Sequence, residues 1–312
     1  MIVAVVDLGT NTCNLLIAKI EAGGFEILCK TKELVKLGDE KIRTNEISLE
    51  ATERVVNAFR KYNTITCDFR VSKVQVVATS ATRSAKNRDE FLTELMNETG
   101  WDVNLISGEQ EADLIFKGVL LAFKVLIKPS VILDIGGGSN EIILGNANNI
   151  LWKESRPSGI GRVINRFTIS DPIQFNEIKI LQQFFLNEHR NGIQQCKNLK
   201  VKTLIGCSGA FDTIADIIDE VNPNKKQRIT QQIGIEEFYR IYEKLLKSKR
   251  EDRLIMKGMD MVRVDLIVPA VILIETLIAQ LGISEIVQTS FALSEGILSG
   301  IIDQKIASTA DE

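Results

Sequence analysis

The N-terminal part of the chain alternates between an apolar run, a polar turn and a second apolar run. Apolar residues from Ile2 to Val6 lead into the turn Asp-Leu-Gly-Thr-Asn-Thr, and a second run covers Leu15 to Ala18. The same order recurs between Val131 and Leu144, around the turn Asp-Ile-Gly-Gly-Gly-Ser. Short apolar runs separated by a polar segment that contains glycine are typical of β-hairpins. The sequence therefore predicts the same hairpin twice.

Each turn has the composition of an anion-binding site. Glycine lets the backbone approach an anion and direct successive N–H groups at it, and a Thr or Ser hydroxyl adds a donor. The aspartate at each strand end, Asp7 or Asp134, can hold hydrated Mg²⁺ or orient water. One such turn alone is better explained as a hairpin capped by its aspartate, but two copies favour phosphate binding. The candidate phosphate-binding residues are Gly9, Thr10, Asn11, Thr12, Gly136, Gly137, Gly138 and Ser139.

A third glycine loop follows the apolar run Val201–Ile205. Gly206, Ser208 and Gly209 precede a helix that we predict to begin near Ala210. The free N–H groups and the dipole of a helix N-terminus attract anions. A junction between strand and helix also carries glycine for purely structural reasons, so both interpretations stay open. We include Gly206, Ser208 and Gly209 among the candidate phosphate-binding residues.

Between the two hairpins, helical and strand patterns alternate, as in α/β folds. The expected elements are a helix capped by Ser48, a strand at 74–78, a helix capped by Asn87 and ended by Gly100, a strand at 103–106 and a helix at 109–123. The second half predicts helices at 174–189, 211–219, 236–247, 265–281 and 293–302, and a strand at 285–288. We expect domains at 1–125 and 126–300, with the last helix, near 300–312, packing back on the first.

Composition limits the class of protein. A chain of 312 residues, 45% hydrophobic and 25% charged, indicates a globular protein with two domains. The net charge of −3 disfavours nucleic-acid binding through bulk charge, so a polyanionic substrate needs a local basic surface. The chain begins without a signal-peptide pattern, and its longest apolar run, 266–274, predicts a buried helix because spanning a bilayer takes roughly 20 residues. Five scattered cysteines without CxxC spacing indicate a reducing cytoplasm.

Acid–base chemistry falls to carboxylates, because the only histidine, His189, has charged neighbours that suggest a solvated helix end. Glu109 and Glu111 open a helix, where a carboxylate near a phosphate site could take a proton from water. Acidic residues also favour the first turn of a helix without any catalytic role.

Basic residues could meet phosphate at several places. Arg83 follows the strand at 74–78 and could either contact phosphate oxygens bidentately or form a solvated turn. Further basic groups are Lys86 with Arg88, then Arg156, Arg162 and Arg166, and finally Lys225, Lys226 and Arg228. We expect these clusters to supply the local positive charge.

Six ordered motifs cover nearly the whole chain, at residues 7–12, 78–83, 106–112, 134–141, 206–209 and 263–265. Together they resemble the exopolyphosphatase and guanosine pentaphosphate phosphohydrolase family, within the superfamily of actin, sugar kinases and heat-shock chaperone ATPases. The resemblance implies an α/β fold of two ribonuclease-H-like domains with the active site in the cleft between them. It also implies release of terminal phosphate from polyphosphate with Mg²⁺.

The resemblance assigns roles by position. Glu111 is the expected general base, and Arg83 is expected to stabilise charge on the transferring phosphoryl group. Asp134 and Glu141 would place water or metal. Asp7 stays a further candidate metal ligand because of its own place at the end of the first strand.

Four features depart from the family pattern. Asn14 stands where a basic residue is frequent, and Ser294 where arginine is usual. The third loop differs from the common Gly-Thr-Gly-Gly-Thr pattern. The chain also ends where many relatives continue into an additional helical domain, so we expect a short form.

The leading functional hypothesis is an exopolyphosphatase that uses Mg²⁺ and a water molecule activated by Glu111. Hydrolysis of guanosine pentaphosphate is an alternative within the same class. An ATP-dependent small-molecule kinase and a non-catalytic nucleotide sensor are alternatives from other classes. We expect polyphosphate or guanosine pentaphosphate as the substrate, no nucleic acid or membrane partner, and a homodimer in the cytoplasm.

Overall fold

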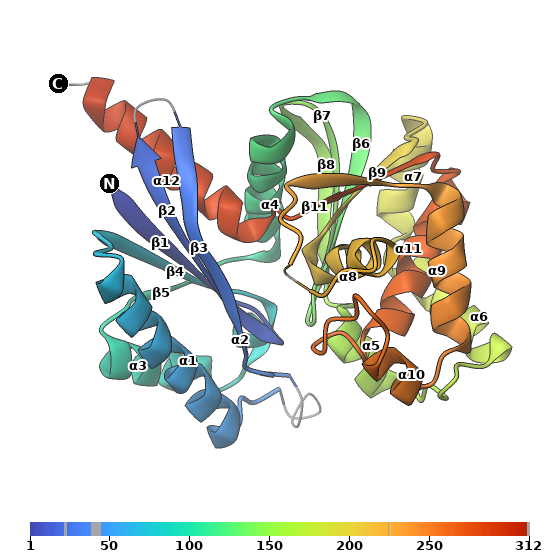
Figure 1. Ribbon diagram of the computed structural model, residues 1–312, viewed down its shortest axis with the longest axis horizontal. Helices are drawn as coiled ribbons and strands as arrows, with labels where there is room; N and C mark the ends of the chain where they lie inside the picture. Colours follow the sequence, from blue (N-terminus) through green and yellow to red (C-terminus); the bar gives the residue numbers. More distant parts are fainter. Residues whose placement is uncertain (22–23, 39–44, 224, 311–312) are drawn as a thin grey trace. The chain divides into compact units, whose positions relative to one another are not determined.

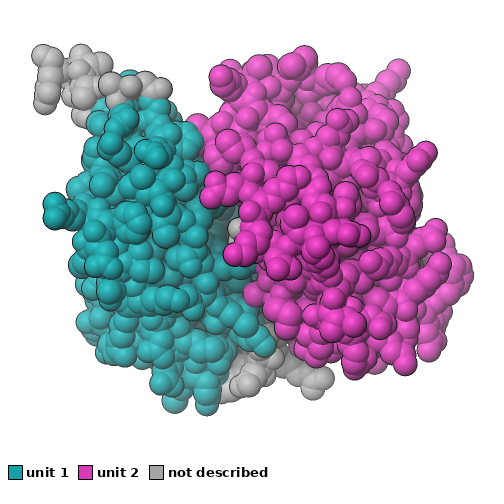
Figure 2. Space-filling model, viewed as in Figure 1, with its two compact units in different colours: residues 1–118, 293–312 teal, residues 119–292 magenta. Residues whose placement is uncertain are grey.

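The computed structural model describes residues 1–21, 24–38, 45–223 and 225–310. The chain forms two compact units, which Figure 2 shows in different colours. Unit 1 comprises residues 1–118 and 293–312, and unit 2 comprises residues 119–292. The division falls within the helix α4 (Gly108–Phe123).

Unit 1 contains a five-stranded sheet in the order β3-β2-β1-β4-β5 (Figure 1). Its strands are β1 (Ile2–Leu8), β2 (Thr12–Glu21), β3 (Gly24–Leu34), β4 (Lys73–Ala78) and β5 (Val103–Leu105). The first three form an antiparallel meander, whereas β4 is parallel to β1 and β5 is parallel to β4. Leu8 pairs with Ala78, and Ala78 with Leu105. The carboxyl ends of β1, β4 and β5 therefore meet at one edge of the sheet.

The helices of unit 1 are α1 (Leu49–Asp68), α2 (Ser80–Ser84), α3 (Arg88–Thr99), most of α4, and α12 (Leu293–Ala310). Ser48 caps α1 as predicted, because its Oγ accepts a 3.2 Å hydrogen bond from the Ala51 N–H. Asn87 precedes α3 without capping it; its side chain exchanges two 2.9 Å hydrogen bonds with the backbone of Ile47. Gly100 ends α3 with φ +72, a conformation that glycine adopts without strain.

The core of unit 1 joins the sheet to the apolar faces of α1 and α3. Leu15, Phe59 and Leu95 belong to this buried cluster. Fully burying side chains of this size stabilises the fold by about 1.5–3 kcal/mol each. The buried Tyr62 hydroxyl donates a 2.6 Å hydrogen bond to the Cys13 carbonyl, which fixes the start of β2 against α1.

Unit 2 repeats the same plan in a six-stranded sheet, in the order β10-β11-β9-β6-β7-β8. Its strands are β6 (Leu126–Ile135), β7 (Asn140–Ala147), β8 (Asn149–Arg156), β9 (Thr203–Cys207), β10 (Thr230–Ile233) and β11 (Glu285–Thr289). An antiparallel meander, β6-β7-β8, is again followed by parallel strands, β9 and β11. Both predicted hairpins are confirmed, and the repeated plan agrees with the prediction of two ribonuclease-H-like domains.

The helices of unit 2 are α5 (Ile160–Arg166), α6 (Phe175–Glu188), α7 (Arg190–Asn198), α8 (Ser208–Ile218), α9 (Ile235–Lys247), α10 (Arg250–Leu254) and α11 (Ile267–Leu281). The predicted buried helix is α11, in which residues 270–274 are at most 2% exposed. In the described part of the chain, no helix combines the length and the apolar character needed to cross a membrane.

The expectation that His189 is solvated is wrong. The residue does connect two helices, α6 and α7, but its side chain is 0% exposed. Its Nδ1 atom lies 3.1 Å from Oε1 of Glu154 on β8. Successive residues of a helix point in different directions. The charged side chains on either side of His189 in the sequence therefore do not show whether His189 itself is buried.

The expectation of an exposed basic cluster at Lys225, Lys226 and Arg228 is wrong for Arg228, whereas the two lysines are exposed. The Arg228 side chain is 8% exposed and donates 2.8 Å hydrogen bonds to Asp216 and Asp219 near the end of α8. Lys226 contacts the same Asp219 carboxylate at 2.6 Å. The Arg228 guanidinium is therefore neutralised within unit 2 and is not part of a solvated basic surface.

Alanine substitutions at two glycines of α12 should have opposite effects on the free energy of unfolding. A methyl group at Gly296 would lie 1.8 Å from the carbonyl oxygen of Leu114 on α4, whereas nothing lies within 4 Å of one at Gly300. We expect Gly296→Ala to lower the free energy of unfolding by about 3 kcal/mol. Gly300→Ala should raise it by about 0.5–1 kcal/mol, because alanine loses less backbone entropy in a helix. Urea unfolding measures both, and equal stabilities would contradict the close packing of α12.

Candidate active site

The two predicted turns have the same backbone geometry. In the first, the Gly9 N–H donates to the Thr12 carbonyl at 2.9 Å, and in the second Gly136 donates to Ser139 at 3.0 Å. A side chain would crowd each turn, since a Cβ atom would lie 3.1 Å from the Thr12 oxygen at Gly9 and 2.6 Å from the Ser139 oxygen at Gly136. Both glycines are therefore required by the close approach of the backbone to itself.

In the first turn, carbonyl groups are held by a neighbouring segment. The N–H groups of Val35 and Lys36 both donate to the Asn11 carbonyl, at 2.9 and 3.0 Å. The Leu37 N–H donates to the Thr10 carbonyl at 2.7 Å. The carbonyl side of the turn is thus occupied by protein.

In the second turn, the start of α5 plays the same part. Ile160 N–H donates to the Gly136 carbonyl at 2.9 Å, and Arg162 N–H to the Gly137 carbonyl at 3.3 Å. The Nε atom of Arg162 also donates to the Gly138 carbonyl at 2.9 Å. Protein donors therefore satisfy the carbonyl groups of residues 10–12 in the first turn and of residues 136–139 in the second.

The N–H groups of each turn, unlike its carbonyl groups, have few protein partners. Within the described residues, no protein acceptor contacts the N–H groups of Thr10 and Asn11, or those of Gly137, Gly138 and Ser139. Successive backbone N–H groups without partners form a concave anion site. A phosphate oxygen is the ligand that such donors fit best, because it carries charge and accepts several hydrogen bonds.

Arg83 and Glu111 meet at the sheet edge where β1, β4 and β5 end. Arg83 lies on α2, directly after β4, and Glu111 lies in the first turn of α4, after β5. The Arg83 Nη1 group donates to Glu111 Oε2 at 3.2 Å and to the Ile106 carbonyl at 2.8 Å. Among the described residues, Nε and Nη2 of Arg83 have no acceptor, so donors remain for an anion.

The position of Glu111 is fixed by the start of α4. Ser107 Oγ accepts from the Gln110 N–H at 3.1 Å, and Gln110 Oε1 accepts from the Ser107 N–H at 2.8 Å. This reciprocal pair is a capping box, which defines where the helix begins. The Glu111 side chain is then 9% exposed, beside the guanidinium of Arg83. A carboxylate held in one orientation at a phosphate site suits a general base.

The aspartates of the two hairpins face different partners. In unit 1, Asp7 pairs across the strands with Asn14, whose Nδ2 group donates to Asp7 Oδ2 at 3.1 Å. At the matching position in unit 2, Asp134 pairs with Glu141. Glu141 is 1% exposed and accepts a 2.7 Å hydrogen bond from the Ser155 hydroxyl. Two carboxylates directly opposite each other repel unless a proton or a cation lies with them.

Burial raises the pKa of Asp134 to about 6, although a hydrogen bond from Ser208 and the charge of Arg263 act in the opposite direction. Arg263 has the converse environment, since burial lowers the pKa of its guanidinium while Asp260, Asp212 and Asp134 raise it. Arg263 thus joins Asp134 at this site, although the sequence marked it only as part of a motif.

The third loop contributes less than expected from its glycines. Gly206 lies inside β9, paired with both β6 and β11, and a Cβ atom there would lie 2.1 Å from the Phe211 ring. Ser208 begins α8 with φ +73, and its Oγ contacts the backbone of Ile135 at 3.1 and 3.3 Å. Gly209 makes room for the Arg263 guanidinium, 2.6 Å from an added Cβ atom. Packing explains Gly206 and Gly209, and phosphate contact by this loop stays a prediction.

The predicted basic wall of unit 2 is divided among other contacts. Arg156 pairs with Glu154 at 3.0 Å, and Arg162 holds the second turn as described. Arg166 lies over the rings of Phe167 and Phe184, 5.4 and 5.0 Å from their centroids. In unit 1, Arg88 contacts its neighbour Asp89 at 3.4 Å.

The carboxylates at the two turns suit Mg²⁺ better than a metal ion that is bound mainly by protein ligands. In the described residues, no three histidine, cysteine or carboxylate side chains gather as a metal site. Mg²⁺ is usually held by one or two carboxylates, with water and substrate phosphate completing its shell. Asp134 and Glu141, paired across β6 and β7, are two carboxylates with the hard oxygen ligands that Mg²⁺ prefers. Asp7 is a weaker candidate, because Asn14 already donates to it.

The raised pKa of Asp134 predicts a pH-dependent stability in the absence of added metal. The folded state favours the protonated carboxyl, so this contribution is present below the unfolded value of about 3.9 and is lost as pH rises through about 6. Asp134→Asn should therefore gain about 2 kcal/mol of stability relative to the wild-type protein between about pH 4 and pH 7.5. Urea unfolding at the two pH values measures this difference, and a difference that does not change with pH would contradict it.

Comparison with known proteins gives consistent matches over the chain. Residues 16–305 match the Ppx/GppA phosphatase family. The crystal structure of an exopolyphosphatase from Cytophaga hutchinsonii is 33% identical, with a TM-score of 0.93, covering 97% of this chain and 98% of that chain. Exopolyphosphatase 2 of Mycobacterium tuberculosis is 26% identical over an alignment of 309 residues, which covers 95% of this chain and 97% of the relative.

A third relative is much longer than this chain. The bifunctional 3-dehydroquinate synthase/phosphatase of Fusobacterium nucleatum is 29% identical over 290 residues, 89% of this chain. The matched part is 43% of that relative's length. The fold predicted from the sequence motifs is confirmed by these matches, together with the predicted enzyme class, a hydrolase. The chain belongs to the Ppx/GppA phosphatase family.

Proposed function

We propose that this phosphatase is an exopolyphosphatase that releases terminal orthophosphate from inorganic polyphosphate. One observation carries the proposal: each unit has a turn of the same geometry whose N–H groups have no protein acceptor among the described residues. A polyphosphate chain presents the same charged group repeatedly, so two sites of like chemistry suit it. The exopolyphosphatase names of the relatives from Cytophaga hutchinsonii and Mycobacterium tuberculosis agree with this substrate.

In the proposed reaction, Glu111 takes a proton from water as the water oxygen bonds to the terminal phosphorus. The phosphoanhydride P–O bond breaks, its electron pair stays with the oxygen of the shortened chain, and orthophosphate leaves. Arg83 would balance the charge on the transferring phosphoryl oxygens through its remaining N–H donors. The N–H groups of the turns would hold substrate phosphates in place.

Asp134 and Glu141 are the residues that would hold Mg²⁺. When bound, Mg²⁺ neutralises phosphate charge and thereby favours attack by an uncharged or negatively charged oxygen. In this chain, Glu141 is kept in position by the Ser155 hydroxyl, and Asp134 lies at the end of β6 beside Ser208. The pair is therefore oriented before any cation arrives.

Phosphate release should be measured with the purified protein on polyphosphate, guanosine pentaphosphate and ATP, each with Mg²⁺ and with excess EDTA. The proposal predicts Mg²⁺-dependent release from polyphosphate with the highest kcat/KM. A higher kcat/KM for guanosine pentaphosphate would replace the substrate but keep the reaction. Transfer of the ATP phosphate to an acceptor without polyphosphate hydrolysis would favour a kinase, and no turnover of any substrate would overturn the enzymatic proposal.

A further inference from the structure

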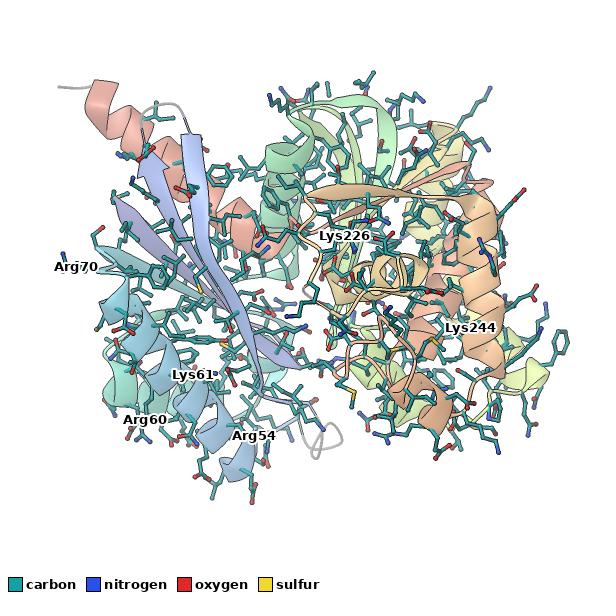
Figure 3. All side chains as sticks on the ribbon, in the orientation of Figure 1. Arg54, Arg60, Lys61, Arg70, Lys226 and Lys244 are labelled. Carbon is teal, nitrogen blue, oxygen red and sulfur yellow. The ribbon has the colours of Figure 1, made fainter. Side chains whose placement is uncertain are left out.

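We propose that Arg54, on α1, is a positioning residue for the first phosphate-binding turn. It acts through residues 35–37, which we call the strap. The inference rests on the proposed function, because it takes the turn at residues 9–12 to bind phosphate. Figure 3 shows Arg54 on α1 together with Arg60, which lies further along the same helix.

The guanidinium of Arg54 holds two successive carbonyl groups of the strap. Its Nε group donates to the Val35 carbonyl at 2.8 Å, and its Nη2 group donates to the Lys36 carbonyl at 3.1 Å. A planar guanidinium has several N–H donors in a fixed arrangement, so it can bind both carbonyl groups at once. The donors of a lysine side chain are all on one ammonium nitrogen. Arg54 makes this contact across a sequence separation of 18 to 19 residues.

The other side of the strap holds the turn. Its three N–H groups donate to the carbonyls of Thr10 and Asn11, at 2.7–3.0 Å. Val35 and Leu37 are buried in the core of unit 1, which anchors the two ends of the strap. Contacts therefore run without a break from Arg54, through the strap, to the carbonyl side of the turn.

The middle of the strap is the part that needs support. Lys36 is exposed and has φ +47, a left-handed conformation that is unfavourable for a residue with a side chain. This conformation lets Val35 and Lys36 direct successive N–H groups at the single Asn11 carbonyl. If Arg54 no longer held the carbonyls, the Lys36 backbone could relax, and the Thr10 and Asn11 N–H groups would lose their fixed direction.

Unit 2 supports its turn in a similar way with a different residue. There the Nε group of Arg162 donates directly to the Gly138 carbonyl at 2.9 Å, alongside the amides at the start of α5. Each turn thus has an arginine on its carbonyl side, acting directly in unit 2 and through the strap in unit 1. The repetition supports a role for Arg54 in holding the turn.

The experiment compares the wild-type protein with Arg54→Met, Arg54→Lys and the control Arg60→Met. Arg60 lies on the same helix, but it is exposed and pairs with Glu98 on α3. Methionine keeps the helix propensity and the apolar stem of arginine at both positions. Kinetics are measured with polyphosphate of one defined length, and urea unfolding shows the fraction of each variant that is folded.

We expect Arg54→Met to raise KM by about tenfold, with a smaller change in kcat, because charged hydrogen bonds from the turn weaken in ground and transition states alike. Arg54→Lys should recover part of this loss, and Arg60→Met should match the wild-type protein. A second readout is binding of inorganic phosphate, followed by the NMR shifts of the Thr10 and Asn11 amides in ¹⁵N-labelled protein. These shifts should occur in the wild-type protein and weaken in Arg54→Met.

Equal KM values for Arg54→Met and Arg60→Met would overturn the positioning role, as would unchanged phosphate-induced shifts of the Thr10 and Asn11 amides. The two proposals fail in different ways. If the wild-type protein hydrolyses none of the substrates, the proposed function fails, while the phosphate titration still decides the role of Arg54.

Discussion

Replacing Glu111 with glutamine is expected to lower kcat for phosphate release by about 10²- to 10⁴-fold, the range that a positioned general base contributes. Glutamine has nearly the same shape and its carbonyl oxygen can still accept from the Arg83 Nη1 group, now 3.2 Å from Glu111 Oε2. It cannot accept the proton of the attacking water. The fold, the Arg83 contact and substrate binding should therefore survive, and KM should change by less than about threefold.

A matched control is available two residues away. Glu109 lies in the same first turn of α4 but is exposed, so Glu109→Gln makes the same chemical change outside the buried site. We expect its kcat to stay near that of the wild-type protein. A steady-state assay of both variants under saturating polyphosphate separates the two positions. Wild-type turnover in Glu111→Gln would remove the residue from the proposed mechanism.

The hairpins could be predicted from the sequence because their signals are local. An apolar run, an aspartate and a glycine turn lie within a dozen residues, and the glycine is needed where the turn's own backbone closes at 2.9–3.0 Å. The start of α1 at Ser48 and the end of α3 at Gly100 could be predicted because helix capping also depends on residues that are close in sequence. The carboxyl ends of β1, β4 and β5 then bring Arg83 and Glu111 together.

Contacts that support the turns could not be predicted, since they join residues far apart in sequence. Nothing in the pattern around Arg54 indicates that it holds Val35, and nothing around Arg162 indicates that it holds Gly138. Arg162 was expected to belong to a basic surface, because charge alone does not show whether a guanidinium faces solvent or a backbone carbonyl.

The glycines of the third loop show why the sequence left two interpretations open. Gly206 looks like the first residue of a phosphate loop, but it is the fourth residue of β9, where the Phe211 ring occupies the space of a side chain. A glycine required for close packing and one required for a turn have the same appearance in a sequence. The sequence did not predict β3 for another reason: none of its residues is buried, so it lacks the apolar run that marks the strands of the two hairpins.

The second large effect concerns Gly159, which lies against the back of the second turn. A methyl group there would lie 2.5 Å from the Gly138 carbonyl carbon and the Ser139 nitrogen, and both are backbone atoms. Gly159→Ala must therefore displace either the turn or the start of α5, whose Ile160 N–H donates to the Gly136 carbonyl. We expect kcat/KM for polyphosphate to fall by about 100-fold, because small misplacements of positioning groups have large kinetic effects.

The expected fall in kcat/KM of Gly159→Ala is larger than partial unfolding of the variant would cause. Overpacking of this kind lowers the free energy of unfolding by about 1–3 kcal/mol, which leaves a protein of ordinary stability mostly folded. Gly24→Ala is the control, since an added methyl group at the start of β3 meets nothing within 4 Å. Steady-state kinetics, corrected for the folded fraction from urea unfolding, compare the two variants. If Gly159→Ala kept wild-type kcat/KM, the second turn would not need its present geometry for phosphate release, and its place in the mechanism would be lost.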